Sequence, residues 1–477
     1  MKMTFENLGA MDSAAIELAS LTVICGENNT GKTYVTYATY ALLEAWRHLT
    51  AWQISENTLS TLKSDGSVTL NLQDELVSQW ETIKQNTSIQ WKKFLPAALA
   101  APESRFEHTV LSFDFELDNR WLERPFEAER LSEQGKVVFS AKKVANSPFL
   151  EIAALRDPSE PAMLRYALED FVREVILESV FGAYISRVFM ASAERTGATI
   201  FKDELNLTKN KIVGLLAQLD KDKTQHITPN ALFAAVYKQG YALPINHNVR
   251  FVNTLSQLEG RPSSLIKAHP ELLDNLKTIA GGNYKTNSDG LTVFIPQGTK
   301  AKLSLTEASS AARSLLVLWY WLIGEASVGD ILMIDEPEMN LHPANQRRMA
   351  RWIARLVNCG VRVFVTTHSD YIVKELNTLI MFNQRTQAIH SIATEQGYSD
   401  EEFLNPEHVR LYVCKEDYIL KRGNKNKTKG MTLIQAEKSV HLGLEVSTFD
   451  TTIDSMNDLQ DRLYYAPADS EEKKESV

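Results

Sequence analysis

Residues 26–33 hold the most restrictive pattern in the chain. They read Gly-Glu-Asn-Asn-Thr-Gly-Lys-Thr, after an apolar stretch at residues 21–25 and before a helix-like stretch. This is the spacing of a P-loop, in which small and turn-forming residues let main-chain N–H groups point at phosphate oxygens. The following helix presents its positive N-terminal end to the same anion. The pattern therefore predicts an α/β domain that binds a nucleoside triphosphate.

Six consecutive residues of this loop are candidate contacts to the nucleotide: Asn28, Asn29, Thr30, Gly31, Lys32 and Thr33. We expect the ammonium group of Lys32 to reach the β- and γ-phosphates of ATP. We expect the hydroxyl of Thr33 to bind Mg²⁺. The alternative is a glycine-containing turn that binds no nucleotide, and the apolar and helical stretches on its two sides favour the P-loop.

A second acidic element lies far downstream, at residues 330–336, which read Asp-Ile-Leu-Met-Ile-Asp-Glu. The apolar run suits a strand that is buried on both faces of a parallel sheet. Asp335 falls at the carboxyl end of that strand, where α/β sheets bind ligands, so we expect it to hold Mg²⁺ directly or through water. Glu336 is expected to polarise a water for attack on the γ-phosphate. A strand that runs into a solvated turn is the alternative.

A third strand pattern, at residues 361–369, ends in Thr-Thr-His-Ser. A lone histidine at a strand end usually has no catalytic role. Here a P-loop, an acidic strand end and a histidine follow one another in the order found in one family of ATPases, so His368 is a candidate catalytic residue.

The chain resembles the ABC-type branch of P-loop ATPases, in the subgroup of the overcoming-lysogenization-defect (OLD) proteins and related anti-phage defence ATPases. The matching segments are residues 5–9, 21–33, 335–343 and 367–372. The resemblance implies an α/β head with a mixed central sheet flanked by helices, a helical insertion, and ATP and Mg²⁺ as cofactors. It implies that His368 contacts the γ-phosphate. It also implies a homo-oligomer, at least a dimer, because in this branch a second subunit completes each site.

Residues 307–313, Glu-Ala-Ser-Ser-Ala-Ala-Arg, occupy the place of the family's signature segment, before an apolar stretch. Serine hydroxyls at a helix N-terminus bind phosphate, so Ser309 and Ser310 are candidate contacts to the nucleotide of a partner subunit. The family usually has glycine where this chain has Ala311, so we expect slow, switch-like ATP hydrolysis. A plain serine N-cap of a buried helix is the alternative.

Residues 189–197 lie where ABC proteins carry a glutamine loop, but no glutamine is present. Related defence ATPases have a similar acidic–arginine turn. Arg195 is therefore a candidate contact to phosphate or to the neighbouring subunit, and a surface ion pair is the alternative. The resemblance divides the chain into an N-terminal part of the head (1–200), a helical insertion (201–280), a C-terminal part of the head (281–400) and a C-terminal segment with a disordered tail (401–477).

The composition restricts the partners and the compartment. The net charge of −9 gives no overall attraction to nucleic acid, so direct nucleic-acid binding is not expected. The three cysteines have no metal-ligand spacing and fit a reducing compartment. The N-terminus lacks an apolar signal core, and the apolar run at residues 315–323 is too short to span a bilayer. We expect a cytoplasmic protein without membrane contacts.

The segment after His368 has a basic stretch at residues 421–429, most simply a solvated loop, but no acidic cluster like that of a Toprim nuclease. The resemblance extends to the ATPase subunit of the PARIS anti-phage systems. It implies a scaffold that holds a separate Toprim-type nuclease effector and releases it when a phage-encoded trigger protein is sensed. Two other functions fit the motifs: an ATPase paired with an HNH nuclease, as in Septu and some retron systems, and a DNA-repair or chromosome-associated ATPase. The acidic charge disfavours the last.

Overall fold

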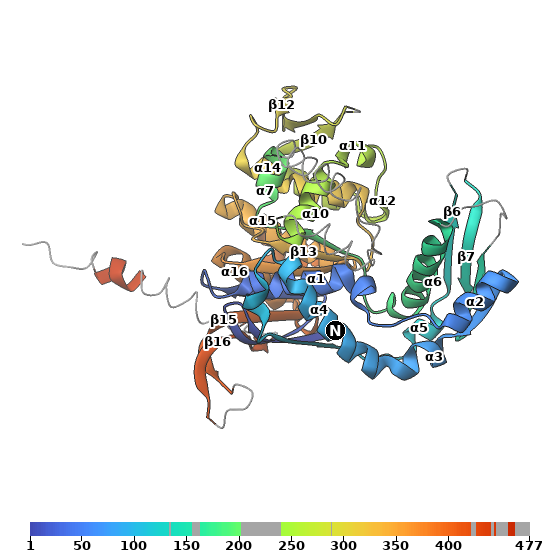
Figure 1. Cartoon of the computed structure of the whole chain (residues 1–477). Helices are drawn as coiled ribbons and strands as arrows, with labels where there is room; N and C mark the ends of the chain where they lie inside the picture. Colours follow the sequence, from blue (N-terminus) through green and yellow to red (C-terminus); the bar gives the residue numbers. More distant parts are fainter. Residues whose placement is uncertain are drawn as a thin grey trace, which may run out of the picture.

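A computed structural model describes residues 1–132, 135–154, 163–201, 240–287, 289–420, 426–439, 443–444 and 457–462. Among these residues, a nine-stranded mixed sheet flanked by helices forms the centre of the molecule, which confirms the predicted α/β head (Figure 1). From one edge to the other its strands are β5 (Val110–Asp114), β1 (Lys2–Leu8), β2 (Met11–Glu17), β16 (Thr428–Gln435), β15 (Val409–Ile419), β3 (Leu21–Gly26), β14 (Arg362–Thr367), β13 (Ile331–Asp335) and β9 (Val188–Ala191).

The half of this sheet from β15 to β9 is parallel. Strands β3 and β13 are buried along their whole length, which explains their nearly uninterrupted apolar residues. Cys25 lies opposite Thr367, and Asp335 lies opposite Thr366. The carboxyl ends of β3, β14 and β13 therefore meet at one edge, and the three predicted motifs follow them there.

Two hydrophobic cores cover the two faces of the sheet. The side chains of β3 point alternately into the two cores: Ile24 packs into one core, and Val23 and Cys25 pack into the other. Helices α1 (Lys32–Leu49) and α4 (Trp80–Ala98) contribute to the first core. Helices α14 (Ser310–Gly324), α15 (Pro343–Asn358) and α16 (Asp370–Phe382) contribute to the second. The P-loop helix α1 is thus anchored by packing along most of its length.

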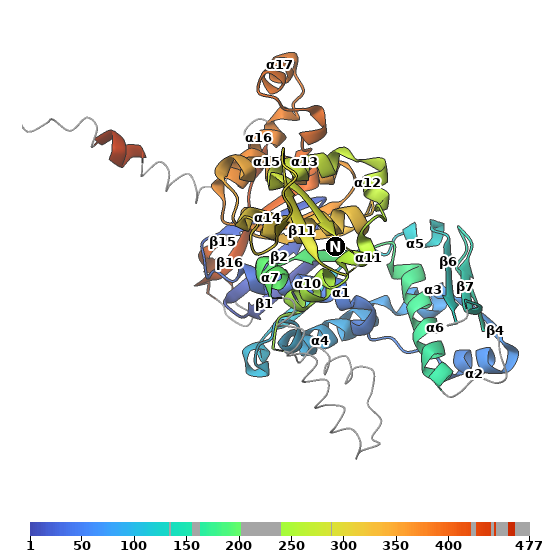
Figure 2. The same ribbon diagram turned by 90° about the horizontal axis from the view of Figure 1, so that it is seen from above.

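A smaller antiparallel sheet stands beside the head in both views (Figures 1 and 2). Its strands are β4 (Ser67–Asn71), β8 (Phe149–Ala154), β7 (Val137–Lys143) and β6 (Phe126–Leu131). The helices α2 (Glu56–Asp65) and α6 (Met163–Phe181) pack against it. Three short elements connect it to the head: α3 (Leu72–Glu75), η1 (Val77–Gln79) and α5 (Arg120–Glu123). Another short element, η2 (Glu103–Phe106), lies within the head between α4 and β5.

Helices dominate the described part of the predicted insertion, residues 240–280, while residues 202–239 lie outside the described residues. These helices are α10 (Leu243–Val252), α11 (Leu255–Leu258), α12 (Ser264–Ala268) and α13 (Glu271–Ala280), and α7 (Arg195–Ile200) precedes them. They lead into a sheet of β10 (Gly282–Thr286), β11 (Thr292–Pro296) and β12 (Leu303–Ser304). The remaining elements are α17 (Gln387–Glu395), η3 (Asp400–Glu402), η4 (Pro406–His408), β17 (Lys438–Ser439) and β18 (Gly443–Leu444).

Two sequence predictions concern the rest of the chain. Residues 421–425 of the basic stretch and the predicted disordered tail at residues 470–477 lie outside the described residues. Within the part of the chain that the structure describes, no helix combines the length and the apolar character that crossing a bilayer requires.

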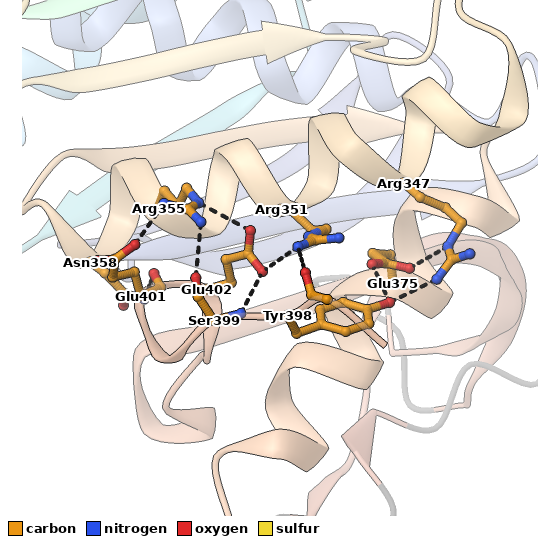
Figure 3. A network of polar contacts seen from close by, with 10 residues as sticks. Arg347, Arg351, Arg355, Asn358, Glu375, Tyr398, Ser399, Glu401 and Glu402 are labelled. Carbon is orange, nitrogen blue, oxygen red and sulfur yellow. Dashed lines mark hydrogen bonds and ion pairs between the residues drawn. The ribbon is translucent and has the colours of Figure 1, made fainter. Parts of the chain in front are cut away.

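A row of arginines holds α15 against α16 and the segment 398–402 (Figure 3). Arg347 Nε donates to Glu375 Oε2 at 2.6 Å, and Arg355 Nε donates to Glu402 Oε1 at 3.0 Å. Arg351, one turn from each of them, lies 2.9 Å from Glu402 Oε2. Both glutamates are 3% exposed, so the arginines supply the positive charge that these buried carboxylates require. The network fixes α15, the helix that begins just after the loop that follows β13.

Candidate nucleotide-binding site

The loop between β3 and α1 closes around the ammonium group of Lys32, whose side chain is buried. The Nζ atom donates to the carbonyl oxygens of Gly26 at 3.0 Å and Glu27 at 2.5 Å. Burial lowers the pKa of Lys32, because its charged form has lost water. A polyphosphate would supply the negative charge that this ammonium group lacks. The lysine predicted to contact phosphate is therefore oriented inside the loop that would hold it.

Two glycines give the loop its shape. Gly26 has φ 140°, and a Cβ atom there would lie 2.5 Å from the carbonyl oxygen of Cys414. Gly31 has φ 93° and forms the N-cap of α1, so its main chain adopts a conformation that favours glycine. Cys414 Sγ also donates to the Thr30 carbonyl at 3.2 Å, so β15 supports the loop from behind. The loop fits a phosphate group because neither glycine carries a side chain and both adopt main-chain conformations that favour glycine.

The outer side of the loop is open. Asn28, Asn29 and Thr33 are exposed, whereas Thr30 is buried. Thr33 lies in the first turn of α1, where a hydroxyl is accessible to a cation bound with the nucleotide. The predicted nucleotide contacts thus divide into buried residues that shape the loop and exposed ones that are free to meet a ligand.

Asp335 lies at the carboxyl end of β13 with 4% of its surface exposed. The Thr366 hydroxyl on the neighbouring strand donates to its Oδ1 atom. Burial raises the pKa of Asp335 to about 6, and the Thr366 hydrogen bond opposes this rise. A divalent cation favours the charged form of a carboxylate and has carboxylate and hydroxyl oxygens as its preferred ligands. Asp335 and Thr33 therefore fit Mg²⁺ in chemistry.

Glu336 and His368 face each other next to this carboxylate. The Glu336 Oε1 atom lies 3.7 Å from His368 Nε2, and both side chains are partly exposed. Burial, followed by the charge of Lys32, lowers the pKa of His368, which favours the neutral imidazole. The ring interacts with the main chain of Gly26 as well. The structure thus brings together the P-loop, the acidic pair and the histidine that the sequence predicted as parts of one site.

Glu338 belongs to this site and was not identified from its sequence pattern. Its Oε1 atom accepts from the main-chain N–H of His368 at 2.6 Å. Its Oε2 atom is buried and has no hydrogen-bond partner among the described residues. Burial raises the pKa of Glu338. A buried acceptor without a partner is one that a bound ligand or water satisfies. The sequence held one signal for a role of Glu338 in the site, namely its position two residues after Glu336.

Glu194 is a second residue that the sequence analysis missed. Its Oε2 atom accepts from the hydroxyl of Tyr37 on α1 at 3.0 Å, and its charge acts on Asp335. It follows β9, which is the neighbour of β13 in the parallel half of the sheet. An acidic residue after a buried strand is the signal that also identified Asp335.

Arg195 occupies a different place from the one predicted. Its side chain is fully buried, and its guanidinium group donates to main-chain carbonyl oxygens of the site rather than lying at a surface. An exposed contact to a partner subunit and a surface ion pair both require an accessible side chain. The predicted contact to phosphate stays a prediction. In the sequence, the strand before Arg195 and the turn after it do not reveal on which side of the main chain its side chain lies.

The signature segment forms the start of α14 as predicted. Ser309 is the N-cap, and its hydroxyl accepts from the N–H of Ala312 at 3.1 Å. Ser309 and Ser310 are both exposed. Among the described residues, neither serine contacts the P-loop of the same chain through a hydrogen bond. The helix N-terminus is therefore accessible to a nucleotide bound by another subunit. The hydrogen bond that Ser309 makes is that of an ordinary N-cap, the alternative given above.

Comparison with known proteins gives one family and several structures. The family described as "AAA domain, putative AbiEii toxin, Type IV TA system" matches residues 21–374. No curated protein matches the chain. An SMC head bound to the C-winged helix domain of ScpA is 11% identical, with 91% of this chain and 97% of that chain covered at a TM-score of 0.33. The SMC head of Thermotoga maritima is 9% identical, with 91% and 98% covered at 0.30.

Proposed function

This chain belongs to the AbiEii-type AAA-domain family, and on that premise we propose that it is the ATP-binding and ATP-hydrolysing scaffold and sensor subunit of an anti-phage defence complex. One observation carries the ATPase part. The buried Lys32, the carboxylates Asp335 and Glu336, and the imidazole of His368 meet at the carboxyl edge of three neighbouring parallel strands.

The residues divide the chemistry of hydrolysis among them. Bound Mg²⁺ would neutralise phosphate charge. Lys32 and the loop N–H groups hold the phosphates, and Glu336 accepts a proton from the attacking water. His368 contacts the γ-phosphate and orients the water together with Glu336. Thr366 and the main chain of His368 fix the two supporting carboxylates, Asp335 and Glu338.

The defence role rests on the resemblance to AriA, the ATPase subunit of PARIS. In the proposed function the subunits form a homo-oligomer in the cytoplasm that holds a Toprim-type nuclease and releases it on sensing a phage-encoded protein. Hydrolysis then acts as a switch between holding and release. Pairing with an HNH nuclease is the second candidate, because the motifs of the head are compatible with both effectors.

We expect the chain alone to leave nucleic acids intact. Incubated with ATP and Mg²⁺ or Mn²⁺, the purified protein should cut neither plasmid DNA nor cellular RNA, and cutting should require a co-purifying second protein. The identity of that protein separates the Toprim from the HNH alternative. A nuclease activity that co-elutes with the chain and disappears in Asp458→Ala would overturn the proposal of a separate effector. Tight, steeply salt-dependent DNA binding by the chain would favour the chromosome-associated alternative.

We also expect the signature serines to act on the nucleotide of another subunit. Lys32→Ala subunits and Ser310→Arg subunits should each be inactive alone, and mixing them should restore part of the ATPase activity through composite sites. Ser64→Arg, at an exposed serine of α2, is the matched control and should not need complementation. A strict monomer in analytical ultracentrifugation with ATP and Mg²⁺ would contradict this arrangement.

A further inference from the structure

Arg195 joins three separate elements behind the catalytic carboxylates. Its Nη1 atom donates to the carbonyl oxygen of Asp335 at 2.7 Å, and its Nη2 atom donates to that of Glu336 at 2.8 Å. Its Nε atom donates to the carbonyl oxygen of Ser314 in α14 at 2.9 Å. Nη1 also donates to the Ser192 carbonyl, at the end of β9, at 2.9 Å. One side chain therefore connects β9, the end of β13 and the first turns of the signature helix.

This arrangement needs arginine. A fully buried cation loses its hydration, and burial lowers the pKa of Arg195 accordingly. Four carbonyl bonds and the charges of Asp335, Glu336 and Glu338 compensate for that loss. The planar guanidinium group directs its donors in several fixed directions at once, whereas a lysine ammonium is a single point charge. Lysine would keep the charge and lose most of the bonds.

The main chain of Glu336 depends on these bonds. Its φ of 51° lies in the left-handed region, which is unfavourable for a residue with a side chain. The N–H of Glu336 donates to the Thr366 carbonyl at 3.0 Å, and its own carbonyl accepts from Arg195. The peptide units on both sides of this strained residue are thus fixed, the first by β14 and the second by Arg195. The direction of the Glu336 side chain follows from the position of its main chain.

We propose that Arg195 is a positioning residue for ATP hydrolysis, which ties the main chain of Glu336 to the signature helix α14. This inference rests on the proposed ATPase function. Because Ser314 lies one turn after Ser310 in α14, a phosphate bound at the start of this helix and the carboxylate of Glu336 are held by one rigid connection. The connection makes hydrolysis responsive to a partner subunit that supplies or receives that phosphate.

Arg195→Lys tests the proposal. We expect kcat to fall on the order of 10- to 100-fold, since small displacements of a catalytic group cost this much, while ATP binding stays unchanged. The matched control is Arg187→Lys. Arg187 connects the opposite ends of the same three elements. It directly precedes β9, and its guanidinium group contacts the carboxylate of Asp330 before β13 and the carbonyl oxygen of Glu325 after α14. Its replacement is expected to lower the melting temperature and leave kcat unchanged.

A double-mutant cycle separates positioning from general destabilisation. If Arg195 acts through Glu336, Arg195→Lys should slow the Glu336→Gln protein by no more than about twofold, whereas independent effects would multiply. Arg195→Gln, which keeps an amide donor without the charge, is the second variant and should behave in the same way. Two results would overturn the positioning role while leaving the proposed ATPase function in place. The first is effects of the two substitutions that multiply, and the second is normal turnover by both Arg195 variants when the wild-type chain is active. A wild-type chain that hydrolyses no ATP would overturn the proposed function with it.

Discussion

Lys32→Ala is expected to abolish ATP binding by this chain. The substitution removes the ammonium charge predicted to meet the β- and γ-phosphates, and it also removes the contacts that close the loop onto the carbonyl oxygens of Gly26 and Glu27. Both losses act against the same ligand, so calorimetric titration with ATP and Mg²⁺ should show no binding. Defence against phage should be lost together with binding.

A second buried lysine provides the matched control. Lys143 in β7 is 1% exposed, and its Nζ atom also donates to main-chain carbonyl oxygens, including that of Leu122 at 3.0 Å. It belongs to the small antiparallel sheet rather than to the nucleotide edge. Lys143→Ala should therefore cost stability and leave ATP affinity unchanged. Wild-type-like titration of Lys32→Ala would refute the P-loop assignment, because that assignment makes Lys32 the contact to the β- and γ-phosphates.

The motifs that meet at this edge of the sheet could be located in the sequence because each of them is local. A P-loop is a continuous segment, and Asp335 and His368 each follow a continuous run of strand residues. Parallel pairing of β3 with β14 and of β14 with β13 then brings the ends of these segments together. The position of α14 was also predictable, since its serine N-cap and its apolar residues are adjacent in the sequence.

Long-range packing could not be predicted in the same way. Strand β15 comes from the C-terminal segment and pairs with β3, which places Cys414 against Thr30 and the main chain of Gly26. An apolar run indicates a strand but not its neighbours. Arg195 is the sharper case, because its charge suggested a surface, whereas carbonyl groups from distant segments surround it. Only the assembled fold shows that those carbonyls converge.

Glu336→Gln should preserve ATP binding and slow its hydrolysis on the order of 10²- to 10⁴-fold, the usual contribution of a general base. Glutamine has nearly the same shape, so the main-chain bonds of residue 336 to Thr366 and Arg195 are retained. The amide cannot accept the proton of the attacking water. The measurement is phosphate release under single-turnover conditions, with ATP affinity determined in parallel.

Glu325→Gln is the matched control for this substitution. Glu325 is also a partly buried glutamate, and burial raises its pKa, but it follows the C-terminal end of α14 and interacts with Arg187. Its replacement should leave turnover unchanged. If Glu336→Gln hydrolyses ATP at the wild-type rate, the base is a different group, and Glu338 and Glu194 are the carboxylates to replace next. Both lie at the same edge, where Glu338 contacts His368 and Glu194 contacts Tyr37 of the P-loop helix.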